Sequence, residues 1–146
     1  MKKFFLITLL SLIFGSYLAN AQITNFDTGR NSNQASLSSV FDNIQSGISA
    51  ANVSRYSSYI SEKSYFSLFN GVNGFFSVNQ SLNLLKDFFN IYKPVSFKFD
   101  PLQGGKNPFA TGTLVYENKG KRENALVFIS LTAEGNGWYI SQFSIK

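Results

Sequence analysis

The chain has 146 residues, carries a formal net charge of +5 and contains neither cysteine nor histidine. The missing residue types exclude disulfides, thiol nucleophiles, histidine-based triads and nearly all zinc or iron sites. The eight acidic residues are dispersed without D-x-D spacing, so we expect no metal site and no cofactor.

Residues 1–21 have the features of a secretory signal peptide. Lys2 and Lys3 give a positive start, an apolar run follows, and Ala19-Asn20-Ala21 places small residues at the positions that signal peptidase reads. The apolar run is shorter than the ~20 residues that a spanning helix needs. We therefore predict cleavage before Gln22, no stable membrane anchor, and a mature protein in the periplasm or outside the cell. A lipoprotein is excluded because lipidation needs a cysteine.

Basic residues are scattered through the rest of the chain. Loss of Lys2 and Lys3 would lower the net charge from +5 to +3. The one basic cluster, residues 119–122, falls in an expected hairpin turn, so we predict no nucleic-acid binding.

The mature chain is expected to begin with a flexible leader, residues 22–35, because this segment is polar. A single domain should then span 36–146. A first helix is predicted over 37–51, capped by Ser36, since apolar residues recur at alternating four- and three-residue spacing. A short second helix is predicted over 53–60. The stripe of the first helix consists of Leu37, Phe41, Ile44, Ile48 and Ala51.

Two short extended segments and a longer helix follow. The segments 65–69 and 75–76 flank the turn dipeptides Asn70-Gly71 and Asn73-Gly74. A helix is predicted over 79–92 and should end before Pro94, which cannot continue it. Its apolar face consists of Leu82, Leu85, Phe88, Phe89 and Tyr92.

Four strands are expected in the last third of the chain, over 94–100, 109–117, 123–132 and 138–145. Turns rich in Gly and Asn join them, which is typical of an antiparallel meander.

Two of these strands carry further information. Residues 125–131 are apolar on both faces, as is usual for a strand covered on both; one cover would be the helices, and the other a partner subunit, the leader or nothing. In a regular last strand, Trp138 and Ile140 would point to one face of the sheet, whereas Phe143 and Ile145 would point to the opposite face. A bulge near Ser141-Gln142 would place all four on one face and bend the sheet.

Three stretches carry a family resemblance: the second helix Asn52–Ile60, the third helix with its lead-in Asn73–Phe89, and the closing strand Gly137–Ile145. In this order they resemble the nuclear-transport-factor-2-like (cystatin-like, SnoaL-like) superfamily, and within it a group of short exported bacterial domains of unknown function. The resemblance implies an α+β fold, in which a curved antiparallel sheet forms a cone around two to three N-terminal helices. It also implies a pocket in the cone that some relatives use and many fill with side chains.

Catalysis is not expected from these residues. Superfamily enzymes of the ketosteroid-isomerase type place a carboxylate base inside the cone, but the strand 65–69 has none, and Asp100 shares the parity of Lys98 at a strand end. The alternative is a small isomerase or dehydratase-like enzyme with a tyrosine donor and a carboxylate base, drawn from Tyr56, Tyr116, Glu62 and Asp87.

The favoured reading is a non-catalytic ligand-binding or protein-interaction module. Large rings would suit a small apolar ligand. A second copy pairing through the outer sheet face is the alternative partner, since it would cover the strand that is apolar on both faces. The expected pocket is lined by Tyr56, Phe76, Phe88, Phe97, Tyr116, Phe128 and Trp138.

Overall fold

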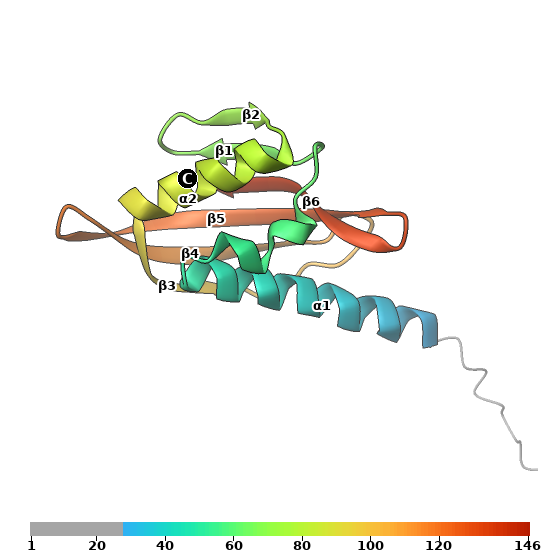
Figure 1. Ribbon diagram of the computed structural model, residues 1–146. Coiled ribbons are helices and arrows are strands. Elements are labelled where there is room, and N and C mark those ends of the chain that lie inside the picture. Colours follow the sequence, from blue (N-terminus) through green and yellow to red (C-terminus); the bar gives the residue numbers. More distant parts are fainter. Residues whose placement is uncertain (1–27) are drawn as a thin grey trace, which may run out of the picture.

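The computed structural model describes residues 28–146, with side chains from residue 37 onward. The predicted signal peptide and the first part of the leader, residues 1–27, lie outside the described residues. Two α-helices and two short 3-10 turns cover one face of a six-stranded sheet (Figure 1). The expected α+β class and the curved, open sheet are confirmed.

Helix α1 (Thr28–Ser49) is longer than the sequence pattern indicates. It begins at Thr28 rather than Leu37, so residues 28–35, which were expected to belong to the leader, are helical, and Ser36 lies inside the helix rather than at its cap. Extending a helix from a packed segment costs little compared with nucleating one, and polar composition alone does not reveal this. The buried stripe is Leu37, Val40, Phe41, Ile44 and Ile48. Val40 was not expected in it, and the expected Ala51 is exposed beyond the end of the helix.

The expected second helix consists of two 3-10 turns, η1 (Val53–Arg55) and η2 (Ser57–Tyr59). Tyr56 lies between them and is fully buried. Its ring packs on Gly47 of α1 so closely that a Cβ at that glycine would overlap the ring. The segment therefore follows α1 tightly.

Strand β1 (Tyr65–Leu68) and strand β2 (Asn73–Phe75) form a hairpin that leads into α2 (Val78–Ile91). A capping box fixes the start of α2: Ser77 accepts from the backbone of Gln80, and the Gln80 side chain accepts from the backbone of Ser77. Leu85, Phe88 and Phe89 form its buried face, as expected.

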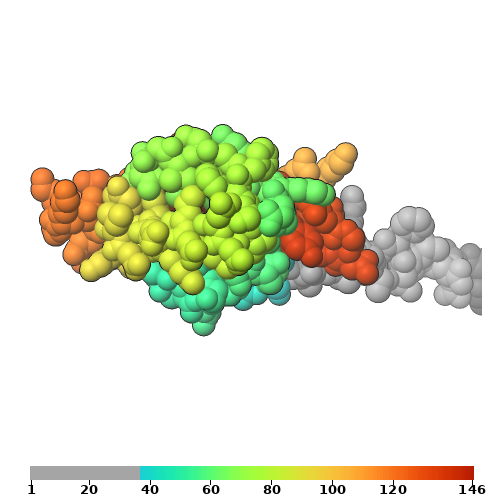
Figure 2. Space-filling model, turned by 45° about the horizontal axis from the view of Figure 1, so that its top comes forward, coloured from blue at the N-terminus to red at the C-terminus, as the bar shows by residue number. Residues whose placement is uncertain are grey.

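The sheet has the order β2-β1-β6-β5-β4-β3. Its long strands are β3 (Lys93–Phe99), β4 (Phe109–Asn118), β5 (Lys121–Glu134) and β6 (Gly137–Ile145). These four form the expected antiparallel meander, whereas β1 pairs with β6 in parallel. In Figure 2 the β4–β5 turn and the β5–β6 turn extend past opposite ends of the layer formed by α2 and the β1–β2 hairpin.

The predicted bulge in the last strand is confirmed. Ser130 pairs with Gln142 and Leu131 with Ile140, so Ser141 is the extra residue. Ile140, Phe143 and Ile145 are fully buried, and Trp138 packs partly buried against the same core. A second bulge, at Val95 in β3, adds to the curvature.

The two faces of β5 differ. Ala125, Val127, Ile129 and Leu131 are buried beneath the helices. On the other face Leu126 is 52% exposed. The helices thus cover the inner face, and the outer face has no cover among the described residues.

Candidate functional site

Four of the residues expected to line a pocket are buried in the core rather than around an open space. At the centre, the ring of Phe143 packs between Tyr56 and Phe66, with centroid distances of 6.2 and 5.7 Å. Interiors are normally filled to high density, and this one follows the rule. The four residues are Tyr56, Phe88, Phe97 and Tyr116.

A second group of rings packs where the end of α2 meets β4. Phe69, from the β1–β2 turn, contacts Phe88, Tyr92 and Tyr116 at centroid distances of 5.1, 4.8 and 5.5 Å. Such ring pairs stabilise a structure beyond their area burial. Phe69 is 37% exposed, and the sequence pattern assigned it no role. These rings pack on one another and so close this end of the inner face.

The other three predicted pocket residues are separated from one another. Phe76 packs half-buried on Phe66 at 6.4 Å. Phe128 lies on the outer face, stacked on Phe109 at 5.5 Å, so the expectation that it shares a pocket with the others is not met. Trp138 lines a groove at the surface. The seven residues therefore do not surround one cavity.

The alternative catalytic pairs are not assembled either. The Tyr116 hydroxyl donates to Glu123 Oε2 at 2.8 Å, and Glu123 is exposed. Burial, followed by the contact with Glu123, raises the pKa of Tyr116 to about 12. Glu62 Oε1 instead accepts from the backbone N–H of Val78 at the start of α2.

Tyr56 has no carboxylate beside its hydroxyl. This hydroxyl is buried and has no hydrogen-bond partner within the described part of the chain, as is also the case for Ser81 Oγ. Burial raises the pKa of Tyr56. Asp87, the other candidate base, is exposed on α2. A neutral, unpaired phenol beneath the helices is a packing residue with a desolvated oxygen, not a proton donor matched to a base.

The open groove exists because β6 is longer than its neighbour β1. Strand β1 pairs only with residues 142–145 of β6. The first half of β6 therefore has β5 on one side, whereas η2 and the segment after it border the other side. We call the hollow here the α1–β6 groove. It encloses about 250 Å³ and is lined by Ser39, Val40, Ser58, Tyr59, Gly137, Trp138 and Tyr139.

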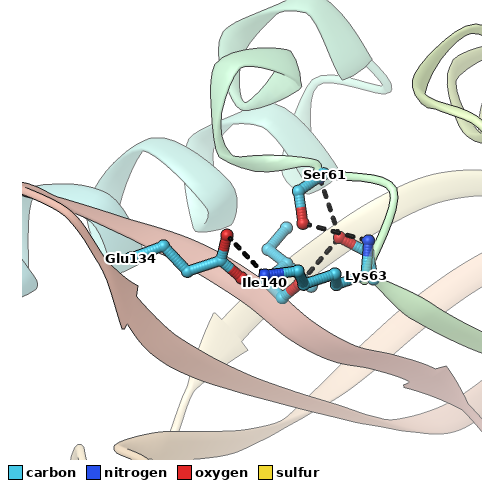
Figure 3. A network of polar contacts seen from close by, with 5 residues as sticks. Ser61, Lys63, Glu134 and Ile140 are labelled. Atoms are coloured by element: carbon cyan, nitrogen blue, oxygen red, sulfur yellow. Dashed lines mark hydrogen bonds and ion pairs between the residues drawn. The ribbon is translucent and has the colours of Figure 1, made fainter.

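A polar network attaches the segment after η2 to this half of β6. Ser64 Oγ donates to the carbonyl of Ile140 at 2.7 Å and accepts from the backbone N–H of Ser61 at 2.9 Å. Beside it, Lys63 Nζ lies 3.6 Å from Glu134 Oε2 (Figure 3). Ser64 is fully buried, so its two bonds fix the position of η2 against the strand.

The groove has an apolar floor and a polar rim. Val40 of α1 is buried at 5% exposure, whereas Ser39 and Ser58 are exposed. Tyr59 is half-buried, and its hydroxyl accepts from Asn43 Nδ2 at 3.0 Å, so its own O–H remains available to donate. The groove thus offers ring surface and hydroxyl groups side by side.

A second hollow of about 200 Å³ lies between α1 and the β3–β4 end of the sheet. Its polar groups are largely engaged: Gln45 Oε1 accepts from the backbone N–H of Phe99, and Asp100 Oδ2 accepts from Thr111 Oγ1. Across the described residues there is no group of acidic side chains able to hold a metal ion. In the same part of the chain, no helix combines the length and apolar character needed to cross a bilayer.

Helices packed on one face of a curved, open six-stranded sheet define the class of nuclear-transport-factor-2-like or cystatin-like proteins, as the resemblance implied. Within this class the chain belongs to the family described as domain of unknown function DUF4783, whose profile matches residues 41–146. No curated protein matches the sequence.

Solved structures show the same fold at low sequence identity. A DUF4783 family protein from Bacteroides uniformis has a TM-score of 0.64 and 18% identity, covering 72% of this chain and 94% of its own. One from Bacteroides ovatus gives 0.62 and 19%, covering 70% and 90%. A domain of unknown function with a cystatin-like fold from Nostoc punctiforme gives 0.61 and 11%, covering 79% and 76%.

Sequence reasoning found Trp138 but missed Tyr59 and Tyr139. A usable signal was present, because adjacent residues of a strand point to opposite faces. Trp138 and Tyr139 could not both enter the core, so one of the two rings had to lie elsewhere.

Proposed function

We propose that the protein is a non-catalytic binding module that takes a small uncharged ligand in the α1–β6 groove. The observation that carries the proposal is the contrast in how rings are used. Core rings stack on other rings, whereas no ring pair in the described part of the chain includes Tyr59, Trp138 or Tyr139. Tyr59 and Trp138 pack half-buried at the edge of the core, and the ring surface that stays exposed is available to a ligand.

The placement of the acidic residues supports a non-catalytic role. Asp42, Glu62, Asp87, Asp100, Glu117 and Glu123 are exposed, and Glu134 is half-buried in its ion pair with Lys63. A general base inside the fold would need a buried carboxylate whose pKa is raised.

The fluorescence of Trp138 tests binding directly, because this is the only tryptophan of the chain. We expect cyclohexanol, a neutral ring with one hydroxyl, to change the emission saturably. Tyr59→Ala should weaken this binding, whereas the control Tyr65→Ala, on the outer face next to Phe75, should not. Unsaturable emission, or equal binding by both variants, would remove the groove from the proposal.

We also propose that residues 1–21 direct export and are then removed. The basis is the charged start, the apolar run and the small residues before Gln22. N-terminal sequencing of the protein recovered from the periplasm or medium should begin at Gln22, and an intact Met1 would contradict it.

Self-association through the outer sheet face is a second candidate. The exposed Leu126, with Phe128 and Phe109 stacked beside it, forms an apolar surface on the face opposite the helices. Thr111, Thr113 and Ser130 are their partners across the β4–β5 ladder, whereas Lys146 lies opposite Leu126 at the other side, so a second copy would meet a mainly uncharged surface with a basic edge. Sedimentation should show a dimer that Leu126→Glu dissociates, with Ile91→Glu on α2 as the control; a monomeric wild type would reject the candidate.

A further inference from the structure

The uncharged lining of the α1–β6 groove points to a class of ligand. Its described lining residues are serine, tyrosine, tryptophan, valine and glycine. Glu134, which pairs with Gly137 across the β5–β6 ladder, has its charge neutralised by Lys63. A charged ligand would find no counter-charge here, and burying an unpaired charge is costly.

The volume of the groove limits the ligand to about one ring. At about 250 Å³ the hollow is smaller than the 300–1,000 Å³ that is usual for a drug-sized ligand. Ser39 and Ser58 on its rim are exposed, so the remainder of a longer molecule could extend into solvent. The groove therefore suits one unit of a larger molecule, or a small ring alone.

Hydroxyl groups around the groove distinguish a polyhydroxylated ring from a purely apolar one. Each serine hydroxyl can donate one hydrogen bond and accept others, and Tyr59 can still donate because Asn43 supplies the proton that its oxygen accepts. A sugar ring has a C–H-rich face that packs on an aromatic ring and hydroxyls at its edge that need such partners. An apolar ring would leave the hydroxyl rim unused.

We propose, resting on the binding role given above, that the α1–β6 groove binds a neutral pyranose unit of a carbohydrate. Tyr59 and Trp138 supply ring surface, and Ser39 and Ser58 bond the sugar hydroxyls.

The test compares ring-sized probes by Trp138 emission: methyl glycosides of glucose, galactose, mannose and N-acetylglucosamine, then cyclohexanol, then tetramethylammonium. For at least one glycoside we expect a dissociation constant on the order of 1 mM, the range for about a dozen heavy atoms. Cyclohexanol should bind at least about tenfold more weakly, since it lacks most of the hydroxyls.

Variants of the rim sharpen the result. Ser58→Ala should weaken the glycoside several-fold and leave cyclohexanol unchanged, whereas Tyr59→Ala should weaken both. Tyr65→Ala should affect neither. Circular dichroism and unfolding curves for each variant separate lost binding from lost structure.

Each outcome decides between the two proposals. If cyclohexanol binds as well as every glycoside, the carbohydrate assignment fails while the binding role stands. Preferential binding of tetramethylammonium would also overturn the assignment, because the rings of Tyr59 and Trp138 would then act on a cation. If no probe binds, both proposals fail.

Discussion

Two regions of this molecule use aromatic residues in opposite ways. Beneath the helices, Tyr56, Phe66 and Phe143 stack on one another and are fully buried. In the α1–β6 groove, Tyr59 and Trp138 are half-buried, and among the residues with described side chains they form no ring pair. The difference arises from strand length, since β1 covers only the second half of β6. An aromatic-rich sequence can thus fill its expected pocket and still leave rings available elsewhere.

Removing a ring should cost most in the core. We expect Phe143→Ala to lower the free energy of unfolding by ~3–5 kcal/mol, because it opens a cavity between two buried rings. Tyr139→Ala on the same strand should cost less than about 1 kcal/mol, as a partly exposed side chain leaves no cavity. Urea unfolding of both variants measures the difference, and equal losses would mean that the groove rings also belong to the core.

Replacing a glycine by alanine should have the next largest effect, and the loss of stability should be greater in the core than at β6. Gly47→Ala should lower the free energy of unfolding by ~1–3 kcal/mol despite the better helix propensity of alanine, because its Cβ would overlap the ring of Tyr56. Gly137→Ala should change it by less than ~0.5 kcal/mol, because its Cβ would meet only the partly exposed ring of Tyr139, which can move aside. A stabilised Gly47→Ala protein would show that the ring of Tyr56 can shift.

The network that borders the groove should couple stability to binding. Ser64→Ala removes the bonds to Ile140 and Ser61 and should cost ~1–2 kcal/mol, while also weakening ligand affinity because η2 loses its attachment to β6. Ser61→Ala is the matched control, because the backbone N–H of Ser61 is the donor and both bonds of Ser64 are kept. If Ser64→Ala left affinity unchanged, η2 would be positioned by other contacts.

A single hydroxyl should give the smallest effect. Tyr56→Phe removes a buried oxygen without a partner, so we expect stability to stay equal or rise by ~1 kcal/mol. Tyr116→Phe should instead lose ~0.5–1 kcal/mol, because that hydroxyl donates to Glu123. Thermal unfolding distinguishes the two, and a clear loss in Tyr56→Phe would reveal a partner for the Tyr56 hydroxyl.

Local patterns in the sequence predicted much of the fold. The change of parity between Ile140 and Phe143 placed the bulge, found at Ser141, because every other residue of a strand must face the core. Glycine and asparagine turns located the last four strands within a few residues. The start of α1 was missed because residues 28–35 have no apolar stripe, and a helix extended from a packed segment does not need one.

The site was harder to predict because it depends on which strands are neighbours. Phe128 belongs to strand β5, which carries apolar residues on both of its faces. The pattern of β5 therefore could not show whether Phe128 points to the inner or the outer face of the sheet. Tyr59 and Trp138 lie far apart in the chain. They come together because β1 pairs with only the second half of β6, so that η2, which contains Tyr59, lies beside the first half. No periodicity within one segment records such a long-range pairing.

The most direct test of this contrast is a ¹H–¹⁵N titration of the mature protein with cyclohexanol, a probe able to enter either an apolar interior or the groove. We predict that the largest shift changes fall on the indole N–H of Trp138 and on the amides of Gly137 and Tyr139. Changes centred instead on Phe66, Leu85 and Phe143 would show that the interior opens to ligands and would contradict the assignment of binding to the α1–β6 groove.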